Sequence, residues 1–363
     1  MKILFGATPV PGHLLPLLPL ADAAADAGHD VAFLTAASMA SFLGGRQLLA
    51  AGPDFDRIVA VNERRVGDAR HFGIAAAELF AGTRVDLTWE DALQQARHHQ
   101  PDLLVGEWVD FVTPLLAARL DVPWAAHSIG GPLPMEFADA LHERANWQHA
   151  FRFLKPRDRI ALLDPVPDSL RLPEDTPPES DRITIRPGRV TEPAARPIPQ
   201  RPASMPRALV TLGTSVGDPE LMAAIAQSVA DAGFDVLATT SPERLRTGPR
   251  MHAVGFTSLP ELLADVDVVI GAAGAGTLLA TLAAGVPTVL FPVLADQPLN
   301  AARAVRRGVG VTIREPNQAG PAAGRILGDP KYRRAAGAMA TEMAAMNSAE
   351  QALAELGYGS ISQ

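Results

Sequence analysis

Short apolar runs alternate with longer amphipathic segments over most of the chain. The runs KILFG (2–6) and VAFLT (31–35) predict buried strands, and the segment 14–27 between them has the spacing of a helix. Strands alternating with helices favour a parallel sheet covered by helices. The same patterns predict strands at 55–61, 102–107 and 122–128, and helices at 37–50, 89–99 and 111–120, with one near 72–81 in an irregular stretch, 62–88.

The composition of the chain changes between residues 155 and 206, where roughly a dozen of its 32 prolines lie. Proline fixes φ and removes a hydrogen-bond donor, so this stretch is expected to be extended surface chain rather than core. We place the domain boundary in the linker 191–206, after an N-terminal domain of residues 1–190.

A second alternation of strands and helices follows the linker. It predicts a C-terminal domain over 207–345, and a last helix over 346–363 that packs back on the N-terminal domain. The fold class is therefore α/β, with two doubly wound, Rossmann-like domains facing across a cleft. The predicted strands are 207–214, 234–240, 251–256, the run ending at Val269–Ile270, 287–293 and 309–313; the helices are 219–233, 258–266, one from Thr277, 297–307, 318–328 and 331–357.

Composition narrows the possible functions. The 363 residues include no Cys, which excludes disulfides and thiolate metal sites, and the net charge of −8 argues against a nucleic-acid partner. The N-terminus reads as a strand rather than a signal peptide, and the uncharged run 278–295 is broken by Gly-Val-Pro, so no membrane span is expected. We expect a cytoplasmic protein.

Polar residues follow several predicted strands. His13 lies in the loop after the first strand and is either a general base or a histidine at a helix N-terminus. Glu107 ends the strand 102–107, where it could orient His13 as the acid of a triad does, with Asp110 as a competitor or an N-cap. Parallel strands place such residues at one edge of the sheet.

The most informative stretch is Val269–Ala301, VIGAAGAGTLLATLAAGVPTVLFPVLADQPLNA. A glycine loop that feeds a helix at Thr277 offers backbone N–H groups and a helix dipole to an anion; alternatively, it is a turn for close packing. The pair Asp296 and Gln297, after the next strand, is either a sugar-hydroxyl clamp or an N-cap.

Three segments carry a resemblance to a known family: GHLLPLLPLADAAADAGHDVAF (12–33), LVTLGT (209–214) and the run from Val254 to Ala304. With them the chain resembles GT-B nucleotide-sugar glycosyltransferases, in the bacterial antibiotic and macrolide branch related to UDP-glycosyltransferases. The resemblance implies an inverting, metal-independent enzyme that moves a sugar, expected to be a deoxysugar, from a TDP- or UDP-sugar to an apolar natural-product aglycone. It implies no cofactor beyond the nucleotide-sugar co-substrate, and a homodimer is among its expectations.

The resemblance also implies roles for individual residues. His13 matches the catalytic base and Glu107 its acidic partner. From the positions of the loops, rather than from a family motif, Phe137, Trp147 and Phe151 are expected either in the acceptor pocket, which loops within 62–90 and 130–155 would line, or in the core. The donor-binding positions implied by the family pattern are Thr214, Ser215, Phe256, Gly274, Gly276, Thr277, Asp296 and Gln297.

The chain departs from the family motif at two positions. The phosphate-binding His of the family is Ala272 here, and the ribose-binding Glu of the plant branch is Ala280. The loss of the His removes a charge-assisted contact to the leaving diphosphate. Two alternatives to an active transferase therefore stay open: a weakly active or inactive transferase-like partner protein, and a sugar-nucleotide epimerase of the same fold.

Overall fold

All strands of the two sheets run parallel to their neighbours, as the alternating pattern predicts. The computed structural model divides into two compact units, Met1–Val166 with Pro173–Gly188 and Asn347–Gln363, and Arg189–Met346 with Pro167–Leu172. The residues described are 1–175, 179–188, 198–202, 204–213, 216–245, 248, 250–255 and 257–359.

The sheet of the first unit has seven strands in the order β3-β2-β1-β4-β5-β6-β7. The strand order reverses between β1 and β4, so this is the switch point of a doubly wound sheet. Its central strands are buried and apolar, as a sheet covered on both faces requires. The strands are β1 Lys2–Gly6, β2 Asp30–Thr35, β3 Gln47–Ala50, β4 Leu103–Glu107, β5 Trp124–His127, β6 Leu162–Asp164 and β7 Arg182–Thr184.

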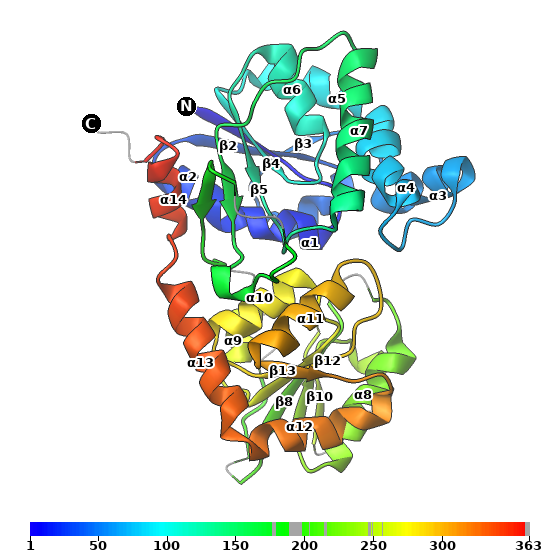
Figure 1. Cartoon of the computed structure of the whole chain (residues 1–363), viewed down its shortest axis with the longest axis vertical. Helices are drawn as coiled ribbons and strands as arrows, with labels where there is room; N and C mark the ends of the chain where they lie inside the picture. The colour runs from blue at the N-terminus through cyan, green and yellow to red at the C-terminus, as the bar shows by residue number, and fades with distance from the viewer. Residues whose placement is uncertain are drawn as a thin grey trace. The chain divides into compact units, whose positions relative to one another are not determined.

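Helices cover both faces of this sheet (Figure 1). A long helical stretch with a π-helical turn, η3, runs through α4, η3 and α5. The helical segments of the first unit are α1 Pro11–Leu14, η1 Leu15–Leu17, α2 Leu18–Asp26, η2 Ala37–Phe42, α3 Phe55–Val66, α4 Ile74–Ala77, η3 Glu78–Thr83, α5 Arg84–His99, α6 Val112–Leu120, α7 Met135–Phe151 and α14 Ala349–Glu355.

The second unit repeats the same design with six strands, in the order β10-β9-β8-β11-β12-β13. Its switch point lies between β8 and β11. The strands are β8 Arg207–Thr211, β9 Asp235–Ala238, β10 Met251–Ala253, β11 Val268–Gly271, β12 Thr288–Leu290 and β13 Gly310–Thr312. The helical segments are η4 Asp168–Leu170, α8 Pro219–Asp231, η5 Pro242–Arg244, α9 Leu259–Leu263, α10 Ala275–Ala283, α11 Gln297–Arg307, η6 Pro316–Gln318, α12 Ala319–Gly328 and α13 Pro330–Ala344.

Two predictions near the start of the chain are wrong. The expected strand at 55–61 is helix α3, whose first turn carries Asp56 and whose last turn carries Arg64 and Arg65, the charges that suit a helix dipole. The expected helix at 37–50 is a short 3₁₀ segment followed by edge strand β3. Gly44 and Gly45, which lie between the 3₁₀ segment and β3, both have positive φ, so a helix cannot continue through them.

Two stretches expected to lie outside regular structure are ordered elements. The range 130–155 contains α7, a helix of 17 residues with few buried positions, so its pattern was too weak to read as a helix. Within the proline-rich stretch, β6 and β7 complete the first sheet. They are only three residues long, and an ion pair between Arg182 and Asp164 joins them at 2.7 Å.

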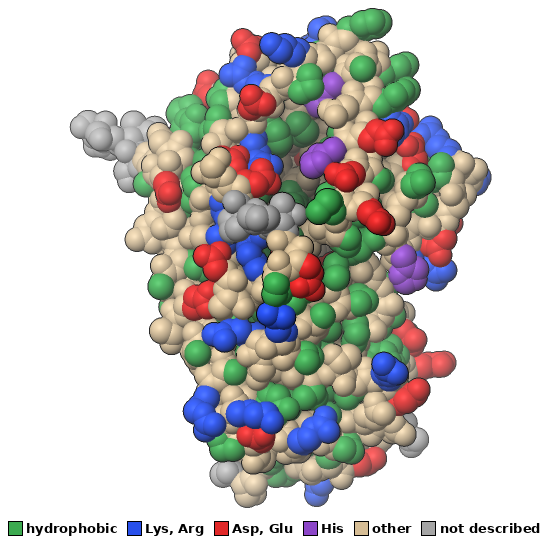
Figure 2. All heavy atoms as spheres, in the orientation of Figure 1, with side chains coloured by type: hydrophobic (Ala, Val, Ile, Leu, Met, Phe, Trp, Pro, Cys, Tyr) green, Lys and Arg blue, Asp and Glu red, His purple; other side chains and the backbone are tan. Residues whose placement is uncertain are grey.

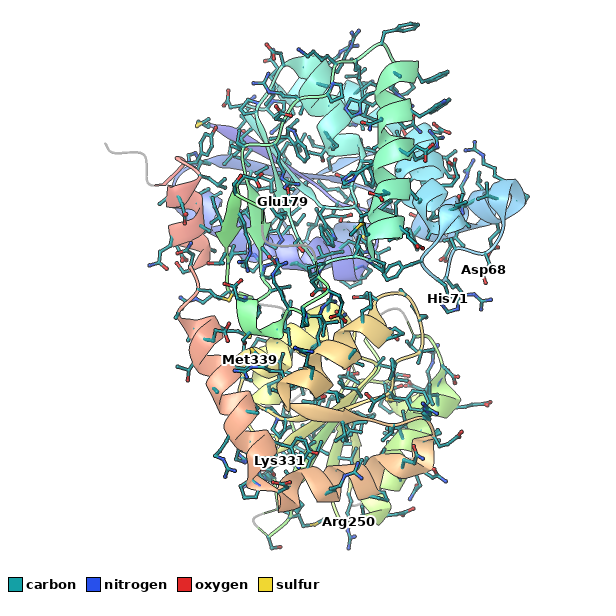
Figure 3. All side chains as sticks on the ribbon, in the orientation of Figure 1. Asp68, His71, Glu179, Arg250, Lys331 and Met339 are labelled. Carbon is teal, nitrogen blue, oxygen red and sulfur yellow. The ribbon has the colours of Figure 1, made fainter. Side chains whose placement is uncertain are left out.

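The single helix predicted over 331–357 is in fact two helices, α13 and α14. Ser348 begins a new helix, α14, by a capping box with Gln351. Helix α14 belongs to the first unit and packs against α2, while His29 Nε2 contacts the Tyr358 carbonyl at 2.9 Å. Helix α13 stays in the second unit, with Lys331 in its first turn and Met339 beside Ser169 of η4 (Figure 3).

Candidate functional site

The switch point of the first sheet brings His13 and Glu107 together. Glu107 is the last residue of β4, and His13 lies in α1, just after β1. The His13 Nδ1 atom lies 3.0 Å from Glu107 Oε1. The His13 side chain is 17% exposed and the Glu107 side chain is fully buried, so a ligand can reach the imidazole but not the carboxylate.

Glu107 is held by a set of donors that reasoning from sequence missed. Thr8 donates to Oε1 through its hydroxyl at 2.6 Å and through its backbone N–H at 3.3 Å. The Val109 N–H donates to Oε2 at 2.9 Å. Thr8 was detectable in the sequence only as a hydroxyl residue in the same loop as His13. With these bonds the carboxylate is a fixed reference point for the imidazole.

The electrostatics of Glu107 favour its ionised form. Burial acts to raise the pKa of Glu107, but the charge of His13, hydrogen bonds from His13 and Thr8, and the nearby Arg84 prevail and hold the pKa below its ordinary value. An ionised carboxylate accepts only, so the facing Nδ1 carries a hydrogen and Nε2 is left for a substrate. Phe80 stacks on the imidazole, with ring centroids 5.8 Å apart.

Asp110, the alternative partner for His13, has a different role. It pairs with buried Arg84 and accepts from the Val112 N–H and the Thr113 hydroxyl at the start of α6. Both of its oxygens are therefore engaged in holding the helix. The structure favours Glu107 as the partner of His13.

The glycine loop of the second unit leads into the amino end of α10. Gly274 is the N-cap residue, and as a glycine it has no side chain with which to cap the helix. The first N–H groups of any helix lack intrahelical partners. A Cβ built on Gly274 or Gly276 would meet no described atom within 4 Å. Open space therefore faces uncapped N–H groups beside Thr277, the arrangement that binds phosphate in other proteins.

Ala272 lies in the same loop and is 3% exposed. It belongs to the core cluster beneath the loop, with Val210, Leu212 and Ile270. The position where the resembled family has a phosphate-binding His is therefore packed against apolar side chains.

Asp296 and Gln297 begin α11, and their polar groups support the neighbouring loop. Gln297 Oε1 accepts from the Val293 and Leu294 N–H groups at 2.8 and 3.0 Å. Asn300, which the sequence reading passed over, donates through Nδ2 to the Ala273 carbonyl at 3.0 Å and to Asp296 Oδ2 at 2.7 Å. Its spacing of four residues from Asp296 on one helix was the only signal. Asn300 ties the glycine loop to α11.

The predicted acceptor contacts Phe137, Trp147 and Phe151 do not lie together. Phe137 is buried in a cluster with Val109 and stacks on Phe72 at 4.7 Å. Trp147 and Phe151 are exposed, stack on each other, and lie toward the other end of α7, where Figure 2 shows hydrophobic side chains at the surface. The predicted donor contacts Thr214, Ser215 and Phe256 lie outside the described residues.

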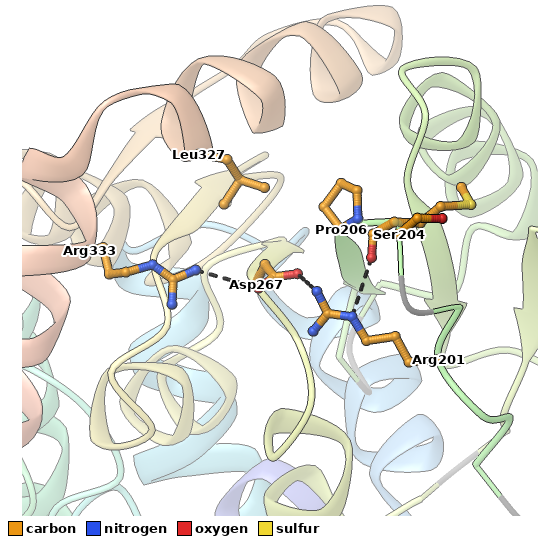
Figure 4. Close-up of a pocket in the computed structure, with 7 residues that line it drawn as sticks. Arg201, Ser204, Pro206, Asp267, Leu327 and Arg333 are labelled. Carbon is orange, nitrogen blue, oxygen red and sulfur yellow. Dashed lines mark hydrogen bonds and ion pairs between the residues drawn. The ribbon is translucent and has the colours of Figure 1, made fainter.

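A separate cavity of about 390 Å³ opens at the amino ends of β8 and β11, the sheet edge opposite the glycine loop (Figure 4). Arg201 pairs there with Asp267 and Asp265, and Arg333 lies 3.5 Å from Asp267. These charged side chains already satisfy one another, so we assign the cavity no role.

The described part of the chain contains neither a helix suited to crossing a membrane nor a group of three or more His, Asp or Glu side chains arranged for a metal ion.

Comparisons with known proteins agree with this geometry. Residues 217–356 match the family model for the erythromycin biosynthesis protein CIII-like C-terminal domain. The L-demethylnoviosyl transferase of Streptomyces niveus is 29% identical over 344 residues, covering 86% of this chain and 85% of that protein. The aclacinomycin-T 2-deoxy-L-fucose transferase of Streptomyces galilaeus is 25% identical over 382 residues, covering 87% and 85%.

Solved structures give the same result for the fold. The glycosyltransferase SsfS6 of Streptomyces sp. SF2575, complexed with thymidine diphosphate, has a TM-score of 0.85 at 25% identity, covering 98% of this chain and 99% of that one. SnogD of Streptomyces nogalater has a TM-score of 0.82 at 26% identity, with the same coverage. The predicted fold class is confirmed, and the chain is similar over most of its length to GT-B glycosyltransferases, among them enzymes of antibiotic biosynthesis.

Proposed function

We propose that the protein transfers a deoxysugar from a TDP-sugar to a hydroxyl of a natural-product aglycone, by a single inverting displacement that needs no metal ion. The pairing of partly exposed His13 with buried, ionised Glu107 carries this proposal. Relatives that are named as deoxysugar transferases, and the thymidine diphosphate bound to SsfS6, support the donor class. A UDP-sugar is the second donor to test.

In this mechanism His13 Nε2 takes the proton of the acceptor hydroxyl as that oxygen attacks the anomeric carbon. Glu107 stabilises the resulting imidazolium and holds the ring in position. The new C–O bond forms on the face opposite the diphosphate, whose own bond to the anomeric carbon breaks. One displacement of this kind inverts the anomeric configuration.

The leaving diphosphate is proposed to settle at the amino end of α10, where the N–H groups of Gly276 and Thr277 meet its developing charge. Thr214 and Ser215 are proposed to approach the donor as well, and Phe256 to stack on the base. Asp296 and the Gln297 amide would hold sugar hydroxyls, since Gln297 Oε1 is already occupied by backbone donors. In this proposal the helix dipole stabilises the charge of the leaving diphosphate, as a metal cation does in other sugar transferases.

The acceptor is proposed to bind within the first unit, near the aromatic cluster that contains Phe80 and Phe137. Trp147 and Phe151 remain proposed contacts for a longer aglycone. Aromatic and aliphatic side chains suit an apolar acceptor.

The test is a transfer assay with TDP- and UDP-sugars and a panel of phenolic and macrolide acceptors, run with and without a chelator. We expect a glycosylated product of inverted configuration and an unchanged rate in the chelator. Nucleotide binding without any transfer would support the alternative of an inactive partner protein. Conversion of the donor to its epimer without an acceptor would support the epimerase alternative.

A further inference from the structure

A second histidine lies beside the proposed base and acid, and the mechanism above does not use it. His127 is the last residue of β5 and is 3% exposed. Its Cα is the registered partner of Glu107 on the adjacent strand β4. Registered residues of parallel neighbours project to the same face of a sheet. Glu107 therefore stands between His13, on the β1 side, and His127, on the β5 side.

The tautomer of His127 is set by the chain itself. Its Nδ1 lies 2.7 Å from the backbone carbonyl of Ser128. A carbonyl only accepts, so Nδ1 carries the hydrogen and donates it. Ser128 is held in turn, because its hydroxyl donates to the Gly130 carbonyl at 2.6 Å. The second ring nitrogen, Nε2, consequently presents a lone pair.

That lone pair has no protein partner among the described residues, and Nε2 is not one of the unpartnered atoms that are sealed from the surface. A side chain this deeply buried normally has its polar atoms satisfied. A lone pair left over at a ligand-binding edge points to a donor group brought by a ligand.

The surroundings keep the imidazole neutral. Burial lowers the pKa of His127 to about 4, while the Ser128 carbonyl and the carboxylates of Asp164 and Glu107 act in the opposite direction. Asp164 is itself paired with Arg182 on β7 and accepts from the Val166 N–H. At neutral pH the ring therefore accepts a hydrogen bond without gaining a charge, which distinguishes its chemistry from that of His13.

We propose that His127 is a positioning residue that accepts, through Nε2, a hydrogen bond from a second hydroxyl of the acceptor. This inference rests on the proposed transferase function. A second hydroxyl held by His127 orients the aglycone, so that its reacting hydroxyl faces His13. A methyl ether at the same place has no hydrogen to donate, so the site selects free hydroxyls over methoxy groups.

Two substitutions separate this role from a structural one. In His127→Asn the side-chain amide replaces Nδ1–H as donor to the Ser128 carbonyl but provides nothing at the Nε2 position. In His127→Gln the longer side chain returns an acceptor oxygen near that position. A purely structural histidine predicts that Asn is the better replacement, whereas the proposed role predicts that Gln is.

The experiment measures binding of 2,7-dihydroxynaphthalene and 7-methoxy-2-naphthol to the TDP-bound protein by fluorescence titration. We expect the diol to bind about five- to tenfold more tightly than the ether, the range for one hydrogen bond to a buried neutral acceptor. The preference should persist in His127→Gln and fall below about twofold in His127→Asn. Equal binding of both compounds to the wild type, or an unchanged preference in His127→Asn, overturns the proposal.

A second readout is spectroscopic and needs no sugar transfer. In the ¹⁵N spectrum of labelled protein, Nε2 of His127 should be unprotonated from pH 5.5 to 8 and should shift when the diol binds. A protonated Nε2 in this range contradicts the assigned tautomer. Discrimination between diol and ether without sugar transfer would refute the proposed function and leave the hydroxyl contact. Sugar transfer that does not depend on His127 would support the proposed function and refute the contact between His127 and the second hydroxyl.

Discussion

Glu107 in the first unit and the amino end of α10 in the second occupy equivalent places, each at the switch point of a doubly wound sheet. They differ in whether their polar groups already have hydrogen-bond partners within the protein. Glu107 is buried and bonded to Thr8, Val109 and His13 before any ligand arrives. The amino end of α10 is preceded by Gly274, which has no side chain to cap it, and among the described residues nothing fills the space at Gly276.

The difference follows from which molecule brings the charge. We call the sheet edge at Glu107 the first edge and the sheet edge at the amino end of α10 the second edge. At the first edge the protein supplies the anion, and a buried carboxylate is tolerated only when donors surround it. At the second edge the proposed ligand supplies the anion, so the protein leaves donors uncovered. The first edge therefore depends on a few side chains, and the second depends on backbone shape.

The largest effect is expected from His13→Ala, at the first edge. Loss of the proposed base should lower the transfer rate by about 10²- to 10⁴-fold while TDP binding stays within about twofold, because the donor loop is untouched. Initial rates and calorimetry with TDP measure the two properties. His142→Ala, which removes an exposed histidine of α7, is the control. Unchanged turnover in His13→Ala would remove the base assignment.

Acid should destabilise the first edge through His127. A folded-state pKa of about 4, against 6.5 for a free histidine, contributes stability above pH 6.5 that is lost as the pH falls toward 4. The full difference corresponds to about 3 kcal/mol. Thermal unfolding of the wild type and of His127→Asn between pH 7 and 4.5 measures it. We expect the wild type to lose more stability; parallel curves would show that His127 is not buried in its neutral form.

Asn300→Leu tests whether the second edge relies on side chains after all. The substitution removes the bonds to the Ala273 carbonyl and Asp296, and the loss of the Asn300 donor to the buried Ala273 carbonyl should cost about 1–3 kcal/mol. Thermal unfolding and the Kd for TDP should both worsen. The control is Asn317→Leu, at an exposed asparagine. Wild-type stability with wild-type TDP affinity would mean that the glycine loop holds its shape unaided.

The smallest effect is expected from filling the open space at α10. Gly276→Leu adds a side chain where a Cβ meets nothing within 4 Å, so the fold should be retained or slightly stabilised. The side chain would occupy the proposed diphosphate site and weaken TDP binding by about tenfold, or about 1.4 kcal/mol. Calorimetry measures this, with Gly324→Leu on α12 as the matched control. Equal TDP affinity in both variants would place the diphosphate elsewhere.

Reading the sequence succeeded where a short element carries a strong local signal. The buried strands that end at Gly6, Glu107 and Gly271 were predicted to within one or two residues, because runs of Val, Ile and Leu suit strands covered on both faces. It failed at α3 and α7. Few of their residues are buried, and their helical state depends on packing against η3, whose partners the sequence does not reveal.

The candidate site, too, could be predicted from the sequence only in part. His13 and Glu107 were candidates from their positions at strand ends, but the choice of Glu107 over Asp110 required Arg84, which reaches Asp110 from another helix. Asn300 and His127 carry no motif of their own. Their roles come from the register and the loop contacts that bring distant residues together.

The sequence by itself determined the α/β class, the parallel sheets, the glycine loop before α10 and the family resemblance. Each of these depends on residue type and spacing along a few turns or strands. Only the tertiary structure decided which carboxylate faces His13, that Ala272 is packed into the core, and that His127 keeps a free lone pair. Those outcomes depend on burial and on partners about 20 to 100 residues away, and the free energy of a polar group is set by its three-dimensional neighbours.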